Sequence, residues 1–250
     1  MQLEKHQMES LEVILSHESV IVGIAISMLL LLILVPLISK IRDNRLLKTV
    51  TSLSRGTKSE RDLVLRLLKK GIPAITIYHD LYIEKTNGKH AQIDVVVATT
   101  EGIIVFEVKD FSGWIFGNGY YPHWTKVLAY GKRKYRFYNP IMQNKNHIAS
   151  IKKQLRQFNN IPFFSIIVFY GDCELKEINY VPNGTFIVKS HRVFEVLNQI
   201  RKNNKPAPYA DKHEIIRLFA QAVEQGNSND IQEEHVEDIK DLTGMHRVYN

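Results

Sequence analysis

Two β-forming segments, residues 92–98 and 103–109, are separated by a short turn, and they constrain this chain more than any other feature. Valine, isoleucine and phenylalanine dominate both segments, and the residues alternate with a period of two. This pattern predicts two strands joined by a tight turn. With the turn centred on Thr100 and Glu101, antiparallel pairing places Asp94 opposite Glu107.

The predicted hairpin gathers charge on one face. Directly opposed residues hold their Cβ atoms about 5 Å apart, so the Asp94 and Glu107 carboxylates would face each other. Lys109 shares the face of Glu107 because side chains two residues apart point the same way. One interpretation is a buried ion pair of Lys109 with either acid, which stabilises a core strand. The other is a divalent cation between the two acids, because hard cations favour carboxylate oxygens.

The charge of the chain is unevenly distributed. The net charge is +7, but residues 1–39 carry −3 and residues 229–250 carry −4, so residues 40–228 carry +14. A folded region this basic indicates a polyanionic partner, either nucleic acid or an anionic membrane surface. A soluble basic domain without such a partner is the alternative. The single cysteine, Cys173, excludes an intrachain disulfide and fits a reducing compartment.

Residues 20–38 form an apolar run interrupted only by Gly23, Ser27 and Pro36, long enough to cross a bilayer. A cleaved signal peptide is the main alternative, but the start is acidic and no small-residue cleavage site follows. The sequence therefore predicts an uncleaved membrane anchor. Four basic residues follow the run against one acid, so the positive-inside rule places the C-terminal domain in the cytoplasm and the N-terminus outside the cell membrane.

The rest of the chain alternates helices and strands. Residues 59–70 predict an amphipathic helix that carries Glu60, and residues 74–84, 163–170 and 185–189 predict strands. Asn139 and Pro140 predict a helix start, and Gln143 and His147 lie one turn apart on that helix. We expect Ser190 to cap a helix and a further helix to run from residue 211 to 225.

A basic and aromatic segment, residues 132–138, precedes the Asn139 helix. Lys132, Arg133, Lys134 and Arg136 alternate with aromatic residues, a mix that suits phosphate contacts and base stacking. A solvated strand edge protected by cations is an equally good interpretation. Trp114 and Trp124 are interpreted as core or hairpin packing, and the histidines and Cys173 as structural, because none shows metal-ligand spacing.

Residues 59–155 resemble the NERD domain, the nuclease-related branch of the PD-(D/E)XK nuclease-like superfamily. The matching residues are Glu60, Gln92-Ile93-Asp94, Glu107-Val108-Lys109, the segment 113–117, Trp124, Asn139-Pro140 and Gln143. One position departs from the family pattern, because Val95 stands where the family often has a histidine.

The resemblance implies an α/β, restriction-endonuclease-like core with a mixed central sheet flanked by helices. It implies that Asp94, Glu107 and the Val108 carbonyl bind Mg²⁺ or Mn²⁺. Lys109 would orient or deprotonate the attacking water, or stabilise the charged transition state. Glu60 would reach the metal directly or through water, and Gln143 would position Lys109 or a phosphate.

The function hypothesis that results is a membrane-anchored, metal-dependent nuclease, a hydrolase that cuts DNA or RNA in the cytoplasm, with DNA as the favoured substrate. The alternative is a non-catalytic nucleic-acid-binding module or membrane scaffold that retains the fold. The expected organisation is an outer segment 1–18, a transmembrane helix 19–39, a basic linker 40–57, a nuclease-like core 58–158, the remainder of the α/β domain 159–225 and an acidic flexible tail 226–250.

Overall fold

The protein is described here from a computed structural model that covers residues 2–84, 89–128, 131–155, 160–209, 212–226 and 247–248. Two compact units follow one another along the chain, Met1–Leu46 and Leu47–Asn250. The predicted turn at 86–89 and most of the predicted acidic tail lie outside the described residues, apart from Lys89, Gly226 and residues 247–248.

The first unit is formed by the helix α1 (Gln2–Leu47). Within it, Val22–Leu47 is long and apolar enough to cross a membrane by length and composition. The described large apolar side chains between Val22 and Ile41 are exposed rather than buried in the protein, as expected for a lipid-facing helix, whereas Leu47 at the end of the stretch is buried. The helix continues past the predicted end of the span at residue 39, so the first part of the predicted linker is helical.

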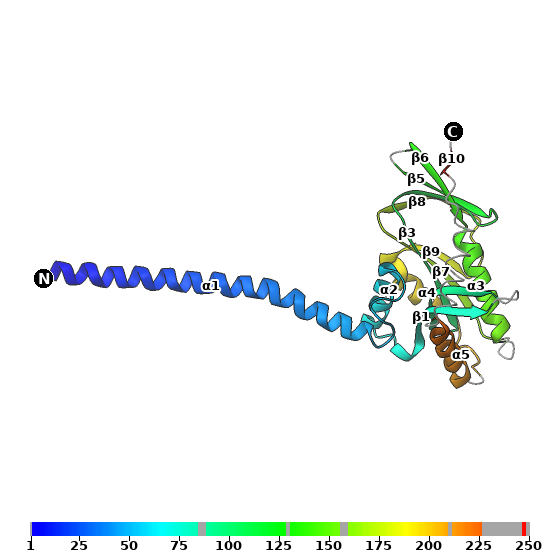
Figure 1. The fold of residues 1–250 in the computed structure, drawn as a ribbon, viewed down its shortest axis with the longest axis horizontal. Coiled ribbons are helices and arrows are strands. Elements are labelled where there is room, and N and C mark those ends of the chain that lie inside the picture. Colours follow the sequence, from blue (N-terminus) through cyan, green and yellow to red (C-terminus); the bar gives the residue numbers. More distant parts are fainter. Residues whose placement is uncertain are drawn as a thin grey trace. The chain divides into compact units, whose positions relative to one another are not determined.

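The second unit is an α/β domain with two mixed five-stranded sheets (Figure 1). The central sheet has the order β1-β2-β3-β7-β9, in which β1, β2 and β3 are antiparallel and β3, β7 and β9 are parallel. The predicted mixed central sheet is confirmed, and the all-apolar strand β7 lies inside it. Its strands are β1 (Ile77–Glu84), β2 (His90–Ala98), β3 (Ile103–Asp110), β7 (Phe163–Tyr170) and β9 (Thr185–Lys189).

The second sheet has the order β10-β6-β5-β4-β8 and was not predicted as a separate layer. Its middle strands form an antiparallel meander, while β4 and β8 are parallel. Trp124 is 1% exposed and stacks on Phe169 of the central sheet, which joins the two sheets in one core. Its strands are β4 (Gly113–Asn118), β5 (His123–Leu128), β6 (Arg133–Tyr138), β8 (Cys173–Asn179) and β10 (Arg247–Val248).

Helices cover the central sheet on both sides, with α2 and α3 flanking it in Figure 1. The helix α2 packs on β1, β2 and β3, α3 packs on β1, β2, β3 and β7, α4 packs on β9, and α5 packs on β1. These helices are α2 (Lys58–Lys69), α3 (Pro140–Gln154), α4 (Val193–Asn203) and α5 (Lys212–Gln225), with short 3₁₀ turns at Ala74–Thr76 and Ser190–Arg192.

The predicted helix ends agree with the structure at two places and differ at a third. The helix predicted at residues 59–70 is α2, which begins and ends one residue earlier, and the predicted Asn139 cap is confirmed, because its side chain accepts a hydrogen bond from the Ile141 amide. The prediction that Ser190 caps a helix is wrong, because Ser190 begins a 3₁₀ turn and α4 follows Arg192 without a side-chain cap.

Candidate active site

The hairpin of β2 and β3 forms in the predicted register. The ladder pairs Ala98 with Ile103 at the turn and ends with Val95 paired to Phe106, which leaves Asp94 opposite Glu107 at the next step. The ladder ends at this point because the Val108 N–H, the next backbone donor of β3 on the side of β2, donates to Asp94 Oδ2 at 2.6 Å instead of to the backbone of β2. The two acids therefore lie where the strands separate.

Val108 contributes a second group to this opening. The N–H and C=O of one strand residue point to the same side of the strand, so the Val108 carbonyl also points toward β2, beyond the last ladder pair. On its other side, β3 is paired in parallel with β7 along its whole length. A backbone oxygen and two carboxylates thus converge on the open end of the hairpin.

Glu107 is the buried centre of the site, with an exposed fraction of 1%. Its Oε1 lies 2.6 Å from Lys109 Nζ, and its Oε2 lies 3.3 Å from His147 Nε2 on α3. Oε2 has no hydrogen bond among the described residues. Burial opposes ionisation, but Lys109 and His147 outweigh it and hold the pKa of Glu107 below its ordinary value.

Lys109 is fixed from two directions. Besides the contact with Glu107, its Nζ donates a hydrogen bond to Gln143 Oε1 on α3 at 3.0 Å. Burial alone would lower the pKa of the Lys109 ammonium, but Glu107 and Asp94 raise it above the ordinary value. The side chain therefore carries its positive charge at neutral pH.

Asp94 is less well compensated than Glu107. Burial and the charges of Glu107 and Glu60 raise the pKa of the Asp94 carboxyl well above its ordinary value, against the opposing effects of Lys109 and the Val108 N–H. Asp94 Oδ1 makes no hydrogen bond within the described part of the chain. The site thus holds more negative charge than its lysine neutralises, a property that suits an added cation.

Glu60 approaches from the opposite face of the sheet. It lies on α2 and is 5% exposed, with Oε2 at 3.4 Å from Nε2 of His79, which β1 places on the face opposite Glu107. Thr57 donates a hydrogen bond to Glu60 Oε1 at 2.7 Å. Burial raises the pKa of Glu60, but His79 and Thr57 outweigh it and lower the pKa overall. Its charge acts on both Asp94 and Lys109.

The five predicted catalytic residues thus lie near one end of the hairpin. Glu107, Lys109 and Gln143 form one contact network, Asp94 is held next to it by the Val108 N–H, and Glu60 lies on the other face of the sheet. The four predicted nucleic-acid-binding residues are not brought to one surface. Arg133 lies on the face of β6 that also carries Phe137, which packs on Trp124, whereas Lys134 and Arg136 alternate to the outer face. Lys132 is exposed in the turn before β6.

Sequence reasoning missed three contributors. The sequence shows no metal-ligand spacing around His147, but its position one turn after Gln143 is the signal that points to its contact with Glu107. His79 contacts Glu60 and could not be found from local spacing. Asp80, opposite Asp94 on β1, adopts a left-handed φ of 57° and is held by Arg55 at 2.8 Å and by Gln92 at 2.6 Å.

Asn144 anchors the helix that carries Gln143 and His147. It is fully buried, and its Nδ2 donates to the Val105 carbonyl and to Ser165 Oγ, both at 2.8 Å. These two bonds attach α3 to the adjacent strands β3 and β7. The positions of Gln143 and His147 relative to Glu107 and Lys109 are therefore set by a buried polar contact as well as by apolar packing.

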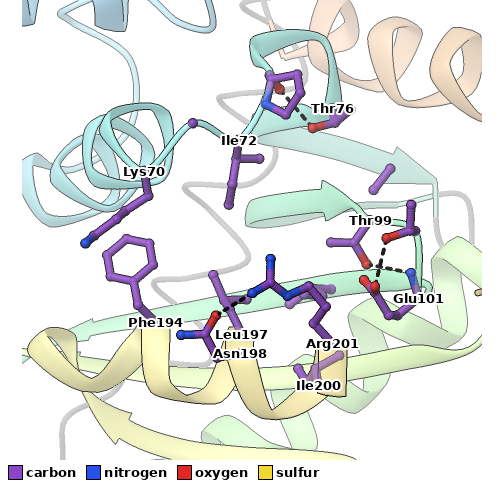
Figure 2. Close-up of a pocket in the computed structure, with 15 residues that line it drawn as sticks. Lys70, Ile72, Thr76, Thr99, Glu101, Phe194, Leu197, Asn198, Ile200 and Arg201 are labelled. Atoms are coloured by element: carbon purple, nitrogen blue, oxygen red, sulfur yellow. Dashed lines mark hydrogen bonds between the residues drawn. The ribbon is translucent and has the colours of Figure 1, made fainter. Parts of the chain in front are cut away.

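A pocket of about 520 Å³ lies at the other end of the hairpin and is distinct from this site (Figure 2). The hairpin turn with Thr99 and Glu101 lines one wall, and α4 lines another with Asn198 and Arg201, whose side chains lie 3.4 Å apart. None of the predicted catalytic residues lines it. Within the described residues, no group of three or more His, Cys, Asp or Glu side chains forms a ready metal cluster.

Comparisons with known proteins identify the family to which this chain belongs. Residues 55–170 match the family model of the nuclease-related domain, NERD. An uncharacterized protein of Bacillus anthracis is 31% identical over 153 residues, which cover 61% of this chain and 67% of the relative. No solved structure matches the chain significantly. The chain belongs to the family of proteins with a NERD, or nuclease-related, domain.

Proposed function

We propose that this protein is a membrane-anchored, metal-dependent nuclease that hydrolyses phosphodiester bonds of DNA, or of RNA, on the cytoplasmic side. The observation that supports the proposal most strongly is the open end of the hairpin, where Asp94 and Glu107 face each other beside Lys109. The charge of +14 over residues 40–228 and the NERD match agree with a nucleic-acid substrate.

The residues at the site fit a divalent cation such as Mg²⁺ or Mn²⁺. Glu107 Oε2 is buried without a hydrogen bond among the described residues, and burial, together with the charges of Glu107 and Glu60, raises the pKa of the Asp94 carboxyl. Asp94, Glu107 and the Val108 carbonyl would hold the ion through oxygen atoms, which Mg²⁺ prefers. When bound, such an ion polarises the scissile phosphate and lowers the pKa of a bound water.

The other residues of the site have separate roles in this proposal. Lys109, held as an ammonium by Glu107 and Gln143, is better suited to donate a hydrogen bond to a phosphate oxygen or a water than to act as a general base. Gln143 and His147 orient Lys109 and Glu107 from α3. Glu60, held by Thr57 and His79, adds negative charge beside Asp94 and can bind a water of the ion.

Membrane attachment of the domain rests on Val22–Leu47, which has the length and composition of a membrane span. Lys40, Arg42, Arg45 and Lys48 lie at its C-terminal end, and the positive-inside rule then places the α/β domain in the cytoplasm. The substrate would be nucleic acid that comes close to the inner membrane surface.

The test is cleavage by the full-length protein in detergent. Plasmid, linear DNA and RNA are incubated with Mg²⁺, with Mn²⁺ or with EDTA, and compared for wild type, Asp94→Asn and Lys109→Met. Glu101→Gln is the matched control, because it removes an acid from the turn at the other end of the same hairpin.

We expect cleavage in Mg²⁺ or Mn²⁺ that EDTA abolishes, and a loss of at least about 100-fold in Asp94→Asn and Lys109→Met. Glu101→Gln should cleave like wild type. Binding of nucleic acid without cleavage under any metal condition would favour the non-catalytic module instead. Equal cleavage by wild type and both site variants would place the activity elsewhere.

A further inference from the structure

Three tyrosines form an exposed group at one end of the second sheet. Tyr120, Tyr121 and Tyr180 are 72%, 63% and 65% exposed. The rings of Tyr120 and Tyr180 contact each other, with centroids 5.3 Å apart, and Tyr121 directly follows Tyr120 in the chain. We call these three residues the tyrosine cluster. A single exposed aromatic ring is common on a protein surface, but adjacent large rings that all face solvent indicate a binding surface.

The backbone beneath the cluster is tightly built. The parallel strands β4 and β8 end side by side at Asn118 and Asn179, and the Gly119 amide donates to the Asn179 carbonyl at 2.9 Å. A Cβ on Gly119 would lie 1.9 Å from the Tyr180 carbonyl oxygen, so only glycine fits there. Tyr180 itself has a left-handed φ of 55°, which is unfavourable for a bulky residue. Strained residues of this kind concentrate at functional sites.

The cluster is connected to the candidate active site through one side chain. Asn139 Nδ2 donates to the Asn118 carbonyl at 3.1 Å and to the Tyr121 carbonyl at 2.8 Å, and Asn139 also caps α3. Gln143 lies one helical turn further, about 6 Å along the axis, and contacts Lys109. The cluster is therefore held at the N-terminal end of the helix that lines the site.

Two cationic side chains lie on β6, the strand that leads to the N-terminal end of α3. Lys134 and Arg136 occupy the outer face of β6, and the strand ends at Tyr138, which is 38% exposed and directly precedes Asn139. Cations that contact phosphates together with exposed rings that stack on bases are the combination that single-stranded nucleic acid requires. A continuous duplex would keep its bases inside the helix and could not use the rings.

We propose that the tyrosine cluster stacks on unpaired bases and holds a single-stranded or frayed nucleic-acid segment beside the Asp94–Glu107 site. The proposal deepens the nuclease proposal, since it names the substrate class of the same site. Binding by the cluster itself does not require hydrolysis, so the two proposals can be tested separately.

The experiment measures binding of the full-length protein in detergent to fluorescent single-stranded and duplex oligonucleotides by anisotropy, with EDTA present to prevent cleavage. Tyr120→Ala and Tyr180→Ala remove one ring each, and Tyr120→Phe keeps the ring without the hydroxyl. Ile75→Ala is the control, because Ile75 is 65% exposed on a different surface segment. Thermal unfolding confirms that each variant is folded.

We expect wild type to bind the single strand more tightly than the duplex. Each alanine variant should bind the single strand about 5- to 150-fold more weakly, since one base stack contributes about 1–3 kcal/mol. Tyr120→Phe and Ile75→Ala should bind like wild type. Arg136→Gln should reduce the salt dependence of binding, whereas the tyrosine variants should leave that dependence unchanged.

Equal single-strand binding by Tyr120→Ala and Tyr120→Phe would overturn the proposal, and so would equal binding of duplex and single strand by wild type. Cleavage assays in Mg²⁺ distinguish the two proposals. Loss of binding in the alanine variants of a protein that never cleaves would support the cluster and contradict the nuclease. Metal-dependent cleavage with unchanged binding in the alanine variants would contradict the cluster alone.

Discussion

Replacement of Lys109 by methionine tests the electrostatics of the hairpin end. The ammonium lies 2.6 Å from Glu107, and the two side chains are 19% and 1% exposed. Breaking a buried ion pair by removing one partner costs about 3–5 kcal/mol, since the other charge is left in a medium of low dielectric constant. Because Lys109 is partly exposed, the expected loss is at the low end, about 3 kcal/mol.

A loss of this size is measurable as a shift in melting temperature. For a domain of this length, 1 kcal/mol corresponds to about 2–4 °C, so Lys109→Met should melt about 6–12 °C below wild type. The assay is thermal unfolding of the full-length protein in detergent at pH 7.5 with EDTA. The control is the double variant Glu107→Gln/Lys109→Met, which removes both members of the pair.

The double variant should be more stable than Lys109→Met, by about 1 kcal/mol or more, because it leaves no unpaired Glu107 carboxylate. Added Mg²⁺ should raise the melting temperature of Lys109→Met, because an ion that binds only the folded state stabilises it. The reasoning is refuted if Lys109→Met melts within about 2 °C of wild type, or if the double variant is no more stable than the single one.

Three further predictions concern stability. In EDTA, Asp94→Asn should gain stability relative to wild type as pH rises from the ordinary carboxyl pKa toward the raised pKa of Asp94, because ionisation of Asp94 is less favourable in the folded state than in the unfolded state; above the raised pKa the difference is constant. A pH series of melting temperatures checks this, and a difference that does not change with pH contradicts it. Gly117→Ala should lose about 1–3 kcal/mol in urea unfolding, since its Cβ would lie 2.3 Å from the Trp124 ring; an unchanged midpoint would mean that the ring moves freely. Asn144→Ala should lose about 1–3 kcal/mol in the same assay, whereas Asn198→Ala, at an exposed position of α4, should stay within about 0.5 kcal/mol of wild type.

The hairpin could be predicted from the sequence because its information is local. Strand alternation and a turn centred on Thr100 and Glu101 determine the register, and the observed ladder confirms it from Val95–Phe106 to Ala98–Ile103. The α3 start was predictable for the same reason, since the Asn139 cap depends on neighbouring residues.

The remaining features depend on long-range contacts. The strand β8, which pairs with β4 across about 60 residues of chain, carries no strong alternation and was not predicted. Asp80, which has a left-handed φ, accepts hydrogen bonds from Arg55 and Gln92, which lie 25 and 12 residues away in sequence. The contact between His79 and Glu60 likewise exists only once α2 packs on β1.

Measurement of Mn²⁺ binding tests most directly whether the hairpin end is a metal-dependent hydrolytic centre. Electron paramagnetic resonance counts free and bound Mn²⁺ for full-length wild type, Asp94→Asn, Glu107→Gln and the control Glu101→Gln. We predict that wild type and the control bind a Mn²⁺ ion that Mg²⁺ displaces, and that Asp94→Asn and Glu107→Gln, both verified as folded, lose it. Unchanged Mn²⁺ binding in Asp94→Asn and Glu107→Gln, or no binding in wild type, would contradict the assignment of the site.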